Sequence, residues 1–141
     1  MVVVRLDVVQ EKVSSAAGRL DDAESILSRP PEEFLADTEG RDLASFYLFL
    51  AIQKCIDLAA HWIAHADWEL PTDSSHAFKV LADQQAIDRD LAGGLSWAVA
   101  VWQRIGREYW TVDHARIQSE HREGISNLRR FLAAAALAAG M

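Results

Sequence analysis

The sequence has few of the residues that interrupt helices or crosslink chains. Its 141 residues include only 3 prolines, 7 glycines and 1 cysteine, while half of them are hydrophobic. This composition disfavours both a disordered chain and a fold of many short strands, because both need more polar or turn-forming residues. Cys55 has no second cysteine to pair with, so no internal disulfide requires an oxidising compartment, and we expect a cytoplasmic protein.

Positive charge is also scarce. The chain carries 14 Lys and Arg against 21 Asp and Glu, which gives a formal net charge of -7. Proteins that coat nucleic acid in general need a surplus of cations, because binding is driven by the release of counterions from the phosphates. The composition therefore excludes such a coat, although a local basic site for RNA remains compatible with it.

Neither end of the sequence has a long uninterrupted apolar segment. Arg5 and Asp7 interrupt the opening MVVVRLDVV, and no small-residue cleavage signal follows, so we do not expect a secretory leader. The FLAAAALAAG run near the C-terminus covers about half of the ~20 apolar residues that a membrane span requires. The ends therefore predict no membrane anchor.

Long helical patterns fill most of the chain. Apolar residues at steps of three, four or seven predict a helix from Val4 to Leu27, which Pro30 and Pro31 would end. The stretch from Arg41 to Asp67 has no Gly or Pro and predicts a long buried central helix. A third helix is expected from Asp88 towards Trp110. A fourth is expected from about Asp113, with an alanine-rich tail that frays.

Short helical pieces are expected between the long ones. The segment 31–37 begins with a proline suited to a first helical turn, and the oxygens of residues 72–75 can cap a short helix through Phe78 and Leu81. Short connections between long helices favour antiparallel neighbours. The sequence thus predicts one all-α domain over residues 1–141, an antiparallel up-and-down bundle of four long helices plus short pieces.

Three segments give the sequence a family resemblance. They are AIQKCIDLAAHWIA at 51–64, the Pro71 to Leu81 segment with its Phe78, and the Tyr-Trp-x-Val-Asp pattern that ends at Asp113. Together they resemble the HepT-like branch of the HEPN superfamily, and the similarity extends from Arg41 to the last predicted helix.

The resemblance implies a helical protein that forms a homodimer and works with a nucleotidyltransferase antitoxin in a toxin–antitoxin module. In such modules the HEPN protein is a metal-independent RNA endonuclease, so no cofactor is implied. Family members carry an Arg, four residues, a His, one residue and a Tyr on the penultimate long helix. The Arg suits a phosphate and the His suits proton transfer near neutral pH. The antitoxin can silence the toxin by adding AMP to the tyrosine.

The present sequence departs from that motif. If Tyr109 is the family tyrosine, and so the AMP acceptor, then Arg107 stands at the His position and Trp102 at the Arg position. A guanidinium stays protonated at ordinary pH, so Arg107 cannot shuttle a proton as a histidine does. Gln103 stands where the family commonly has Asn. This alignment predicts that RNA cleavage is weakened or lost, while binding of the nucleotidyltransferase is retained.

A competing alignment predicts an active endoribonuclease. Arg107, six residues and His114 match the longest spacing that the superfamily tolerates, which makes these two residues candidate catalytic groups. Arg104 and Arg107 are then candidate RNA-binding residues, although exposure to solvent or ion pairing is the favoured explanation for both. This register breaks the Tyr-Trp-x-Val-Asp match. It also separates the two Cα atoms by ~10 Å along a continuous helix.

A third possibility comes from Asp57, His61 and His65, which lie four residues apart on one helical face. Such spacing suits a metal-dependent helical enzyme, but a bundle metal site normally draws ligands from several helices. We therefore favour a buried, hydrogen-bonded structural role for Asp57 and His61, with no metal. The tryptophans at 97, 102 and 110 are expected to pack in the core or at an interface rather than to stack on bases.

Overall fold

The computed structural model describes residues 6–141, which contain six α-helices, two short 3-10 turns and no strand. The elements are α1 (Leu6–Leu27), α2 (Pro31–Ala36), α3 (Thr38–His65), η1 (Ser74–His76), α4 (Ala77–Asp83), α5 (Arg89–Arg107), η2 (Tyr109–Thr111) and α6 (His114–Ala138). The predicted all-α fold is confirmed. The expected helix start at Val4 lies outside the described residues.

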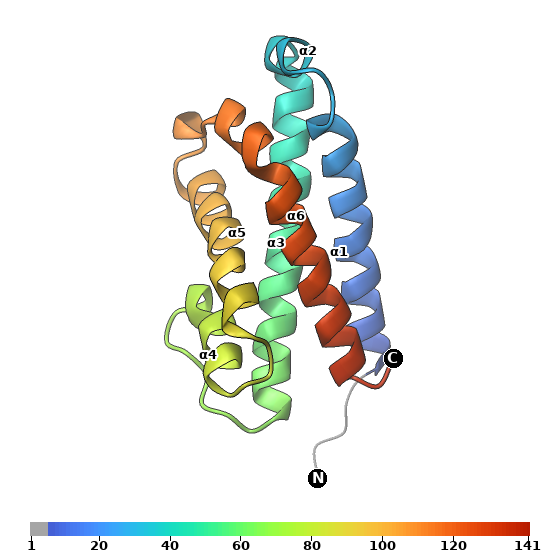
Figure 1. Ribbon diagram of the computed structural model, residues 1–141, viewed down its shortest axis with the longest axis vertical. Coiled ribbons are helices and arrows are strands. Elements are labelled where there is room, and N and C mark those ends of the chain that lie inside the picture. Colours follow the sequence, from blue (N-terminus) through green and yellow to red (C-terminus); the bar gives the residue numbers. More distant parts are fainter. Residues whose placement is uncertain (1–5) are drawn as a thin grey trace.

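Four of these helices, α1, α3, α5 and α6, are long and lie side by side, and the chain reverses direction between successive ones (Figure 1). Helix α3 contacts α1, α4, α5 and α6, so it forms the centre of the molecule. Helix α2 and the turn from α5 to α6 lie at one end of the bundle, and α4 lies beside the N-terminal part of α5 (Figure 1). The end that carries η2 also carries the start of α3.

The central position of α3 accounts for its composition. By length and apolar content it resembles a membrane span, yet half of its most apolar stretch is buried within the bundle. Burying apolar side chains is worth about 25 cal/mol per Å² removed from water, and this is the main force that holds the helices together. The fully buried side chains of α3 include Leu48, Ile52, Ile56 and Ile63.

Aspartates fix where the long helices begin. In α3, α5 and α6 the aspartate before the first residue accepts a hydrogen bond from a backbone N–H three residues later. These bonds join Asp37 to Gly40 (3.0 Å), Asp88 to Leu91 (2.6 Å) and Asp113 to Arg116 (3.0 Å). Each such cap is worth ~1 kcal/mol. The starts after Asp88 and Asp113 agree with the sequence prediction, whereas α3 begins at Thr38 and not at Arg41.

The connection between α5 and α6 differs from the prediction. Helix α5 ends at Arg107 instead of continuing towards Trp110, and η2 follows it. Arg104 Nη1 donates to Thr111 Oγ1 (3.1 Å), while the Thr111 hydroxyl donates to the Glu108 carbonyl oxygen (2.7 Å). These bonds fold the chain back on the last turn of α5. Arg107 and His114 therefore lie on two different helices.

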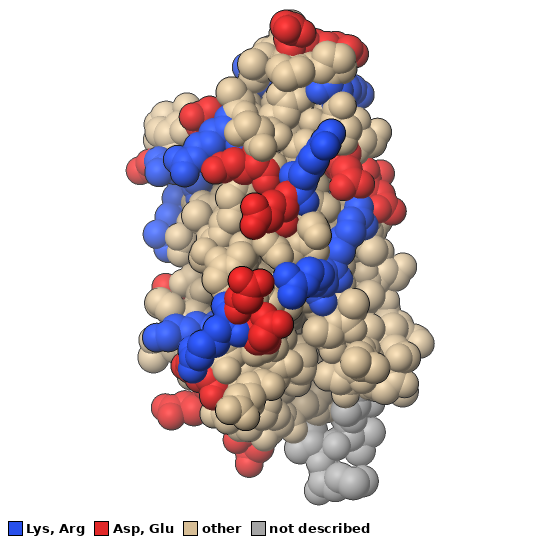
Figure 2. Space-filling view, in the orientation of Figure 1, with Lys and Arg blue, Asp and Glu red and all other residues tan. Residues whose placement is uncertain are grey.

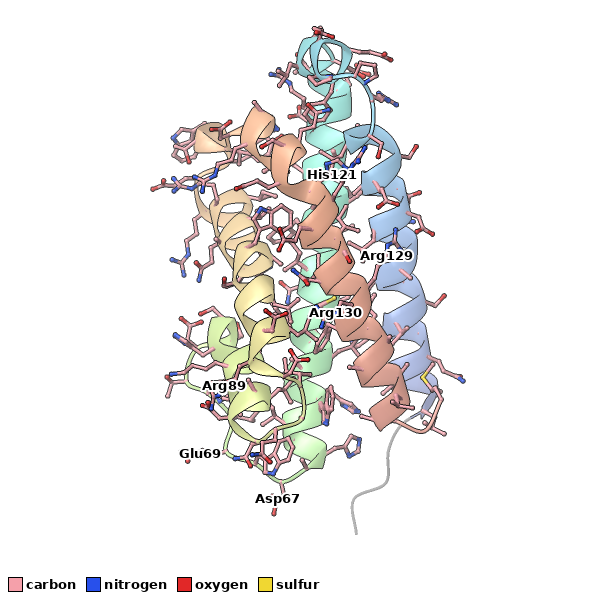
Figure 3. All side chains as sticks on the ribbon, viewed as in Figure 1. Asp67, Glu69, Arg89, His121, Arg129 and Arg130 are labelled. Carbon is pink, nitrogen blue, oxygen red and sulfur yellow. The ribbon has the colours of Figure 1, made fainter. Side chains whose placement is uncertain are left out.

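Helix α6 is fixed against α1 along its length. Arg129 on α6 pairs with Asp21 (2.9 Å) and Glu24 (3.2 Å) of α1 (Figure 3). Gln118 Nε2 donates to the carbonyl oxygens of Leu27 (3.2 Å) and Arg29 (2.9 Å), and so satisfies groups at the end of α1. Contrary to the expected fraying, α6 stays helical through Ala138.

Glycines allow α5 and α6 to approach each other closely. A Cβ on Gly94 of α5 would collide with the side chain of Asn127, and one on Gly124 of α6 would collide with the Trp97 ring. Gly93 has nothing within 4 Å of that position. Close helix packing thus explains the second glycine of the Gly93–Gly94 pair but not the first.

Candidate functional site

Tyr109 lies at the junction of three elements. It follows the end of α5 in η2, and its phenol donates a short hydrogen bond to Oδ1 of Asp42 on α3, a residue 67 positions away in the sequence. The ring of His114, the first residue of α6, meets the Tyr109 ring edge-on at a centroid distance of 5.9 Å. The side chains of Tyr109, Asp42 and His114 are thus brought together at one end of the bundle, and we call them the Tyr109 cluster.

The surroundings of Tyr109 keep its hydroxyl protonated. Desolvation raises the pKa of Tyr109 above its ordinary value of 10.0, and the hydrogen bond to Asp42 raises it further. Ser45 and Arg41 act in the opposite direction without reversing the shift. At neutral pH this side chain is a neutral phenol whose proton already points at a carboxylate.

His114 is shifted towards its neutral form. Burial lowers its pKa below the ordinary value of 6.5, and the positive charge of Arg41 lowers the pKa further. Asp42 and Asp113 oppose this shift with their negative charges. The imidazole is therefore uncharged at neutral pH and can accept a proton.

Arg41 completes this polar group from the first turns of α3. Its Nη2 donates to the Thr38 hydroxyl (3.1 Å), but its Nε is buried and has no hydrogen-bond partner among residues 6–141. A buried donor that belongs to a charged group loses free energy when it is left unsatisfied. Arg41 thus keeps a positive charge near Tyr109 with one buried donor unsatisfied.

Trp102, at the position that the resemblance assigns to the family arginine, has a structural environment. Its Nε1 donates to Gln53 Oε1 (3.1 Å), and its ring stacks on Phe49 at 6.3 Å with an interplanar angle of 17°. Gln53 Nε2 in turn donates to Asp57 (3.1 Å), which Lys12 of α1 approaches at 3.7 Å. The indole thereby links α5 to α3 and, through Asp57, to α1.

Neither Arg104 nor Arg107 is among the groups that shift the pKa of Tyr109. Arg104 bonds to Thr111 and lies 3.6 Å from Glu108. Arg107 is exposed at the end of α5, and its charge is the smallest of the causes that lower the pKa of Asp73, after hydrogen bonds from Ser75 and the charge of His76. Arg107 thus lies towards η1, whereas the charges that act on His114 belong to the start of α3 and to its own helix cap. Within one chain the two candidate catalytic residues face different elements.

Gln103 faces the same side as Arg107. It lines a groove between α5 and the η1–α4 segment, together with the basic side chains of His76, Lys79 and Arg89. This groove is separate from the Tyr109 cluster, because none of the residues that surround Tyr109 contribute to its walls. Gln103 therefore does not extend the polar site around the tyrosine.

The residues of the possible metal site form a different arrangement. The rings of His61 and His65 lie at right angles with centroids 4.3 Å apart, while the side chain of Asp57 is 43% exposed and bonds to Gln53. Asp57 is thus not the buried residue that we expected. In the part of the chain that the structure describes, no three His, Cys, Asp or Glu side chains converge to hold a metal ion. Burial also raises the pKa of the Cys55 thiol, which makes it a poor nucleophile.

The three tryptophans near the site differ in their surroundings. Trp97 covers Gly124 and donates to Glu120 Oε1 (3.3 Å), and Trp102 packs on Phe49, so both match the expected packing role. Trp110 is 82% exposed, so within one chain it packs against very little. Phe46 and Leu43 on α3 are also exposed, at 53% and 45%.

Sequence reasoning missed Arg41, Asp42 and Ser45. They stand at the start of α3, at positions that the sequence analysis treated only as part of a central helix. Their relation to Tyr109 depends on how α3 and η2 meet in space, and no local spacing reports that contact. The one available signal was the adjacent pair of charges Arg41-Asp42 at the start of the apolar stretch.

The sequence matches the family model of HepT-like ribonucleases over residues 17–135, which include all of α2 to α5, the Tyr109 cluster and most of α6. The chain belongs to this family. No curated protein matches it in sequence. Membership confirms the resemblance stated above.

Solved structures share the fold of this HepT-like chain. A toxin–antitoxin complex with AMP-PNP contains a chain with a TM-score of 0.79 and 17% identity, and the match covers 92% of this chain and 98% of that one. A tri-AMPylated HEPN toxin from Shewanella oneidensis, in complex with its MNT antitoxin, also has a TM-score of 0.79, with 18% identity and coverages of 91% and 96%. The cytosolic protein YutE from Bacillus subtilis, of unknown function, reaches 0.82 at 13% identity, with coverages of 95% and 90%. At such low identities the likeness shows the fold.

Proposed function

We propose that this HepT-like chain is, as one domain, the HEPN component of a toxin–antitoxin pair in which RNA cleavage is weakened or lost. In this proposal a nucleotidyltransferase partner still binds the chain and adds AMP to Tyr109. One observation carries the proposal. The Tyr109 phenol is held by Asp42 at the end of the bundle, whereas Trp102 and Arg107 stand where the family motif has its Arg and His.

The acceptor role of Tyr109 is supported by its geometry. Its hydroxyl is bonded to an exposed carboxylate, and the side chain itself is only partly buried, so a partner enzyme can approach it. The structural neighbours include a HEPN toxin that is tri-AMPylated in complex with an MNT antitoxin. The present tyrosine offers the same kind of group in a chain of the same fold.

The loss of cleavage is supported by the two replaced positions. Trp102 has no positive charge to hold a phosphate, and its indole N–H is already bonded to Gln53. Arg107 keeps its proton at any ordinary pH, so it cannot act as a general base. When Tyr109 is aligned with the family tyrosine, the phosphate-holding group and the proton shuttle of the family motif are therefore both absent.

The surface around Tyr109 supports pairing of two chains. Leu43, Phe46 and Trp110 are exposed apolar side chains near the tyrosine, and such aromatic surface is typical of interfaces. We include a homodimer and a cytoplasmic location in the proposal. On the face that Figure 2 shows, Lys and Arg alternate with Asp and Glu, so this face offers no continuous basic surface for RNA.

The second candidate function is an active endoribonuclease that uses Arg107 and His114. His114 favours it, because a neutral imidazole next to a partly buried tyrosine is a suitable general base. Since Arg107 and His114 face different elements of one chain, this mechanism needs Arg107 of one subunit and His114 of the other in a two-fold cleft.

RNA cleavage in the presence of a chelator separates the two candidates. We expect no cleavage by the wild-type protein and continued co-purification with the nucleotidyltransferase partner. Cleavage that disappears in both the His114→Ala and the Arg107→Ala variants would instead establish the endoribonuclease. Arg89→Ala is the matched control, because Arg89 is an exposed arginine at the far end of α5.

A further inference from the structure

We propose that Asp42 accepts the phenol proton when a nucleotidyl group is transferred to Tyr109, and that Arg41 holds the phosphodiester that forms there. The inference rests on the proposed function, since it explains how the acceptor chain itself assists its own modification. It assigns roles to two residues of α3 that lie outside the family motif.

The carboxylate of Asp42 is positioned for this task. Its Oδ1 accepts the Tyr109 hydroxyl directly, so the proton needs to move only along an existing hydrogen bond. Among residues 6–141, no Lys, Arg or His forms a salt bridge with Asp42, and its side chain is exposed. No ion pair within this part of the chain therefore competes with the Tyr109 hydroxyl for the carboxylate.

The reaction balances without any further reactant beyond a nucleoside triphosphate such as ATP. The Tyr109 oxygen attacks the α-phosphorus, a new oxygen–phosphorus bond forms, and the bond from that phosphorus to the pyrophosphate oxygen breaks. Pyrophosphate leaves, and the phenol proton passes to Asp42. A carboxylate is a much weaker base than a phenolate, so the proton moves as the new bond forms rather than before it.

Arg41 suits the product of this step. The new phosphodiester carries one negative charge beside the former phenol oxygen, and a guanidinium binds such an anion through parallel charge-assisted hydrogen bonds. The buried Nε of Arg41 lacks a hydrogen-bond partner within the described residues, and its charge acts on both Tyr109 and His114. The anion would supply the missing acceptor.

His114 is the other group near Tyr109 that can take up a proton. The charged and titratable groups that face the phenol are Asp42 and Arg41 from α3 and His114 from α6. The contact with His114 is an edge-on ring contact, whereas the hydroxyl itself is bonded to Asp42. The geometry therefore favours the Asp42 carboxylate over His114 as the acceptor of the phenol proton. His114→Ala serves as the variant for comparison.

The rate of modification tests this assignment. The purified chain is incubated with its nucleotidyltransferase partner and ATP, and intact mass is followed over time. We expect Asp42→Asn to slow the first adenylyl addition by about 10²-fold or more, the scale of general base catalysis, while Asp42→Glu recovers part of the rate. Arg41→Ala and His114→Ala should each slow it less than Asp42→Asn does, and Arg89→Ala, at the far end of α5, should leave it near wild type. An Asp42→Asn variant that is modified at the wild-type rate would overturn the proposal.

A second measurement does not depend on the partner. The chain has only two tyrosines, so Tyr47→Phe leaves the Tyr109 phenol as the single one to titrate by ultraviolet absorbance. In this background we expect Asp42→Asn to lower the Tyr109 pKa, because the bond to the carboxylate raises it. An unchanged titration would contradict the role of Asp42. If Asp42→Asn shifts the titration but even the wild-type chain gains no adenylyl group, the proposed function fails, and the inference fails with it.

Discussion

Two regions that contact α3 use their polar side chains in different ways. Around Trp102, the indole, Gln53 and Asp57 form fixed hydrogen bonds that link three helices. Around Tyr109, the phenol, Asp42 and His114 form a polar, titratable cluster at the end of the bundle. The side chains of the first region hold helices together, whereas those of the second can exchange protons.

The comparison separates two requirements, one for RNA cleavage and one for accepting a nucleotidyl group, and under the proposed function only the second is still met. Holding an RNA phosphate needs a cation at position 102, and the indole that replaces it is instead used for packing on Phe49. Accepting a nucleotidyl group needs only an accessible hydroxyl and a nearby base, which Tyr109 and Asp42 still supply. Under the proposed function, such a chain remains under the control of an antitoxin enzyme although its own cleavage is weakened or lost.

Restoring the motif is the strongest way to test this contrast. The double variant Trp102→Arg with Arg107→His reinstates both catalytic groups, and we expect RNA cleavage to rise by about 10²-fold to 10⁴-fold over wild type. A gel assay with chelator measures the rate, and circular dichroism checks that the variant is folded. The single variant Arg107→His is the control and should gain little. If the double variant folds but cuts no RNA, the replacements at positions 102 and 107 are not the reason why cleavage is lost.

Overpacking between α5 and α6 should lower stability without altering the Tyr109 cluster. A methyl group at Gly124 would collide with the Trp97 ring, so we expect Gly124→Ala to reduce the free energy of unfolding by about 1–3 kcal/mol. Gly93→Ala is the matched control. It has open space and should stabilise α5 by up to about 1 kcal/mol. Urea denaturation measures the free energy of unfolding of both variants. Equal effects would contradict the close contact between Gly124 and the Trp97 ring.

Removing one hydrogen bond in each region compares how much the two regions contribute to the free energy of unfolding. Trp102→Phe keeps an aromatic ring on Phe49 but leaves Gln53 Oε1 without its donor, which should cost about 1 kcal/mol. Tyr109→Phe removes a bond to an exposed carboxylate and should cost less than about 0.5 kcal/mol. The midpoint of urea unfolding reports both changes. A larger cost for Tyr109→Phe would reverse our assignment of the two regions.

The smallest expected effect is a pH dependence from His114. Its pKa is lower in the folded chain than the ordinary 6.5, so the unfolded chain binds the proton more tightly. The contribution of His114 to stability is therefore full above pH 6.5 and is lost as the pH falls through the folded pKa. Unfolding measured from about pH 8 to about pH 5 should show a shallower decline for His114→Gln than for wild type. Parallel curves would contradict the downward shift of the His114 pKa, which burial and Arg41 produce against the opposing charges of Asp42 and Asp113.

The sequence predicted helices well where the cause is local. Asp88 and Asp113 begin helices through their own side chains, and the composition of residues 41–67 reports that α3 is surrounded by other helices. The end of α5 at Arg107 could not be predicted in the same way. Gly106 stands one residue before that end but is itself helical, so it does not mark the stop. The turn is held by bonds from Arg104 and Thr111 that form only once the chain has folded back.

The candidate site was predictable only in part. Tyr109 followed from a short motif, because Tyr-Trp-x-Val-Asp is contiguous in the sequence. Its partner Asp42 is 67 residues away, and a contact of that range depends on the topology of the bundle. The exposure of Trp110 could not be predicted either, since the composition of a segment does not report which aromatic side chain faces solvent.

Intact mass after co-expression with the nucleotidyltransferase partner tests the central claim most directly. We predict that the wild-type chain and the Tyr47→Phe control both gain increments of one adenylyl group, and that Tyr109→Phe gains none. Increments that persist in Tyr109→Phe, or that are absent from the wild-type chain, would contradict the account.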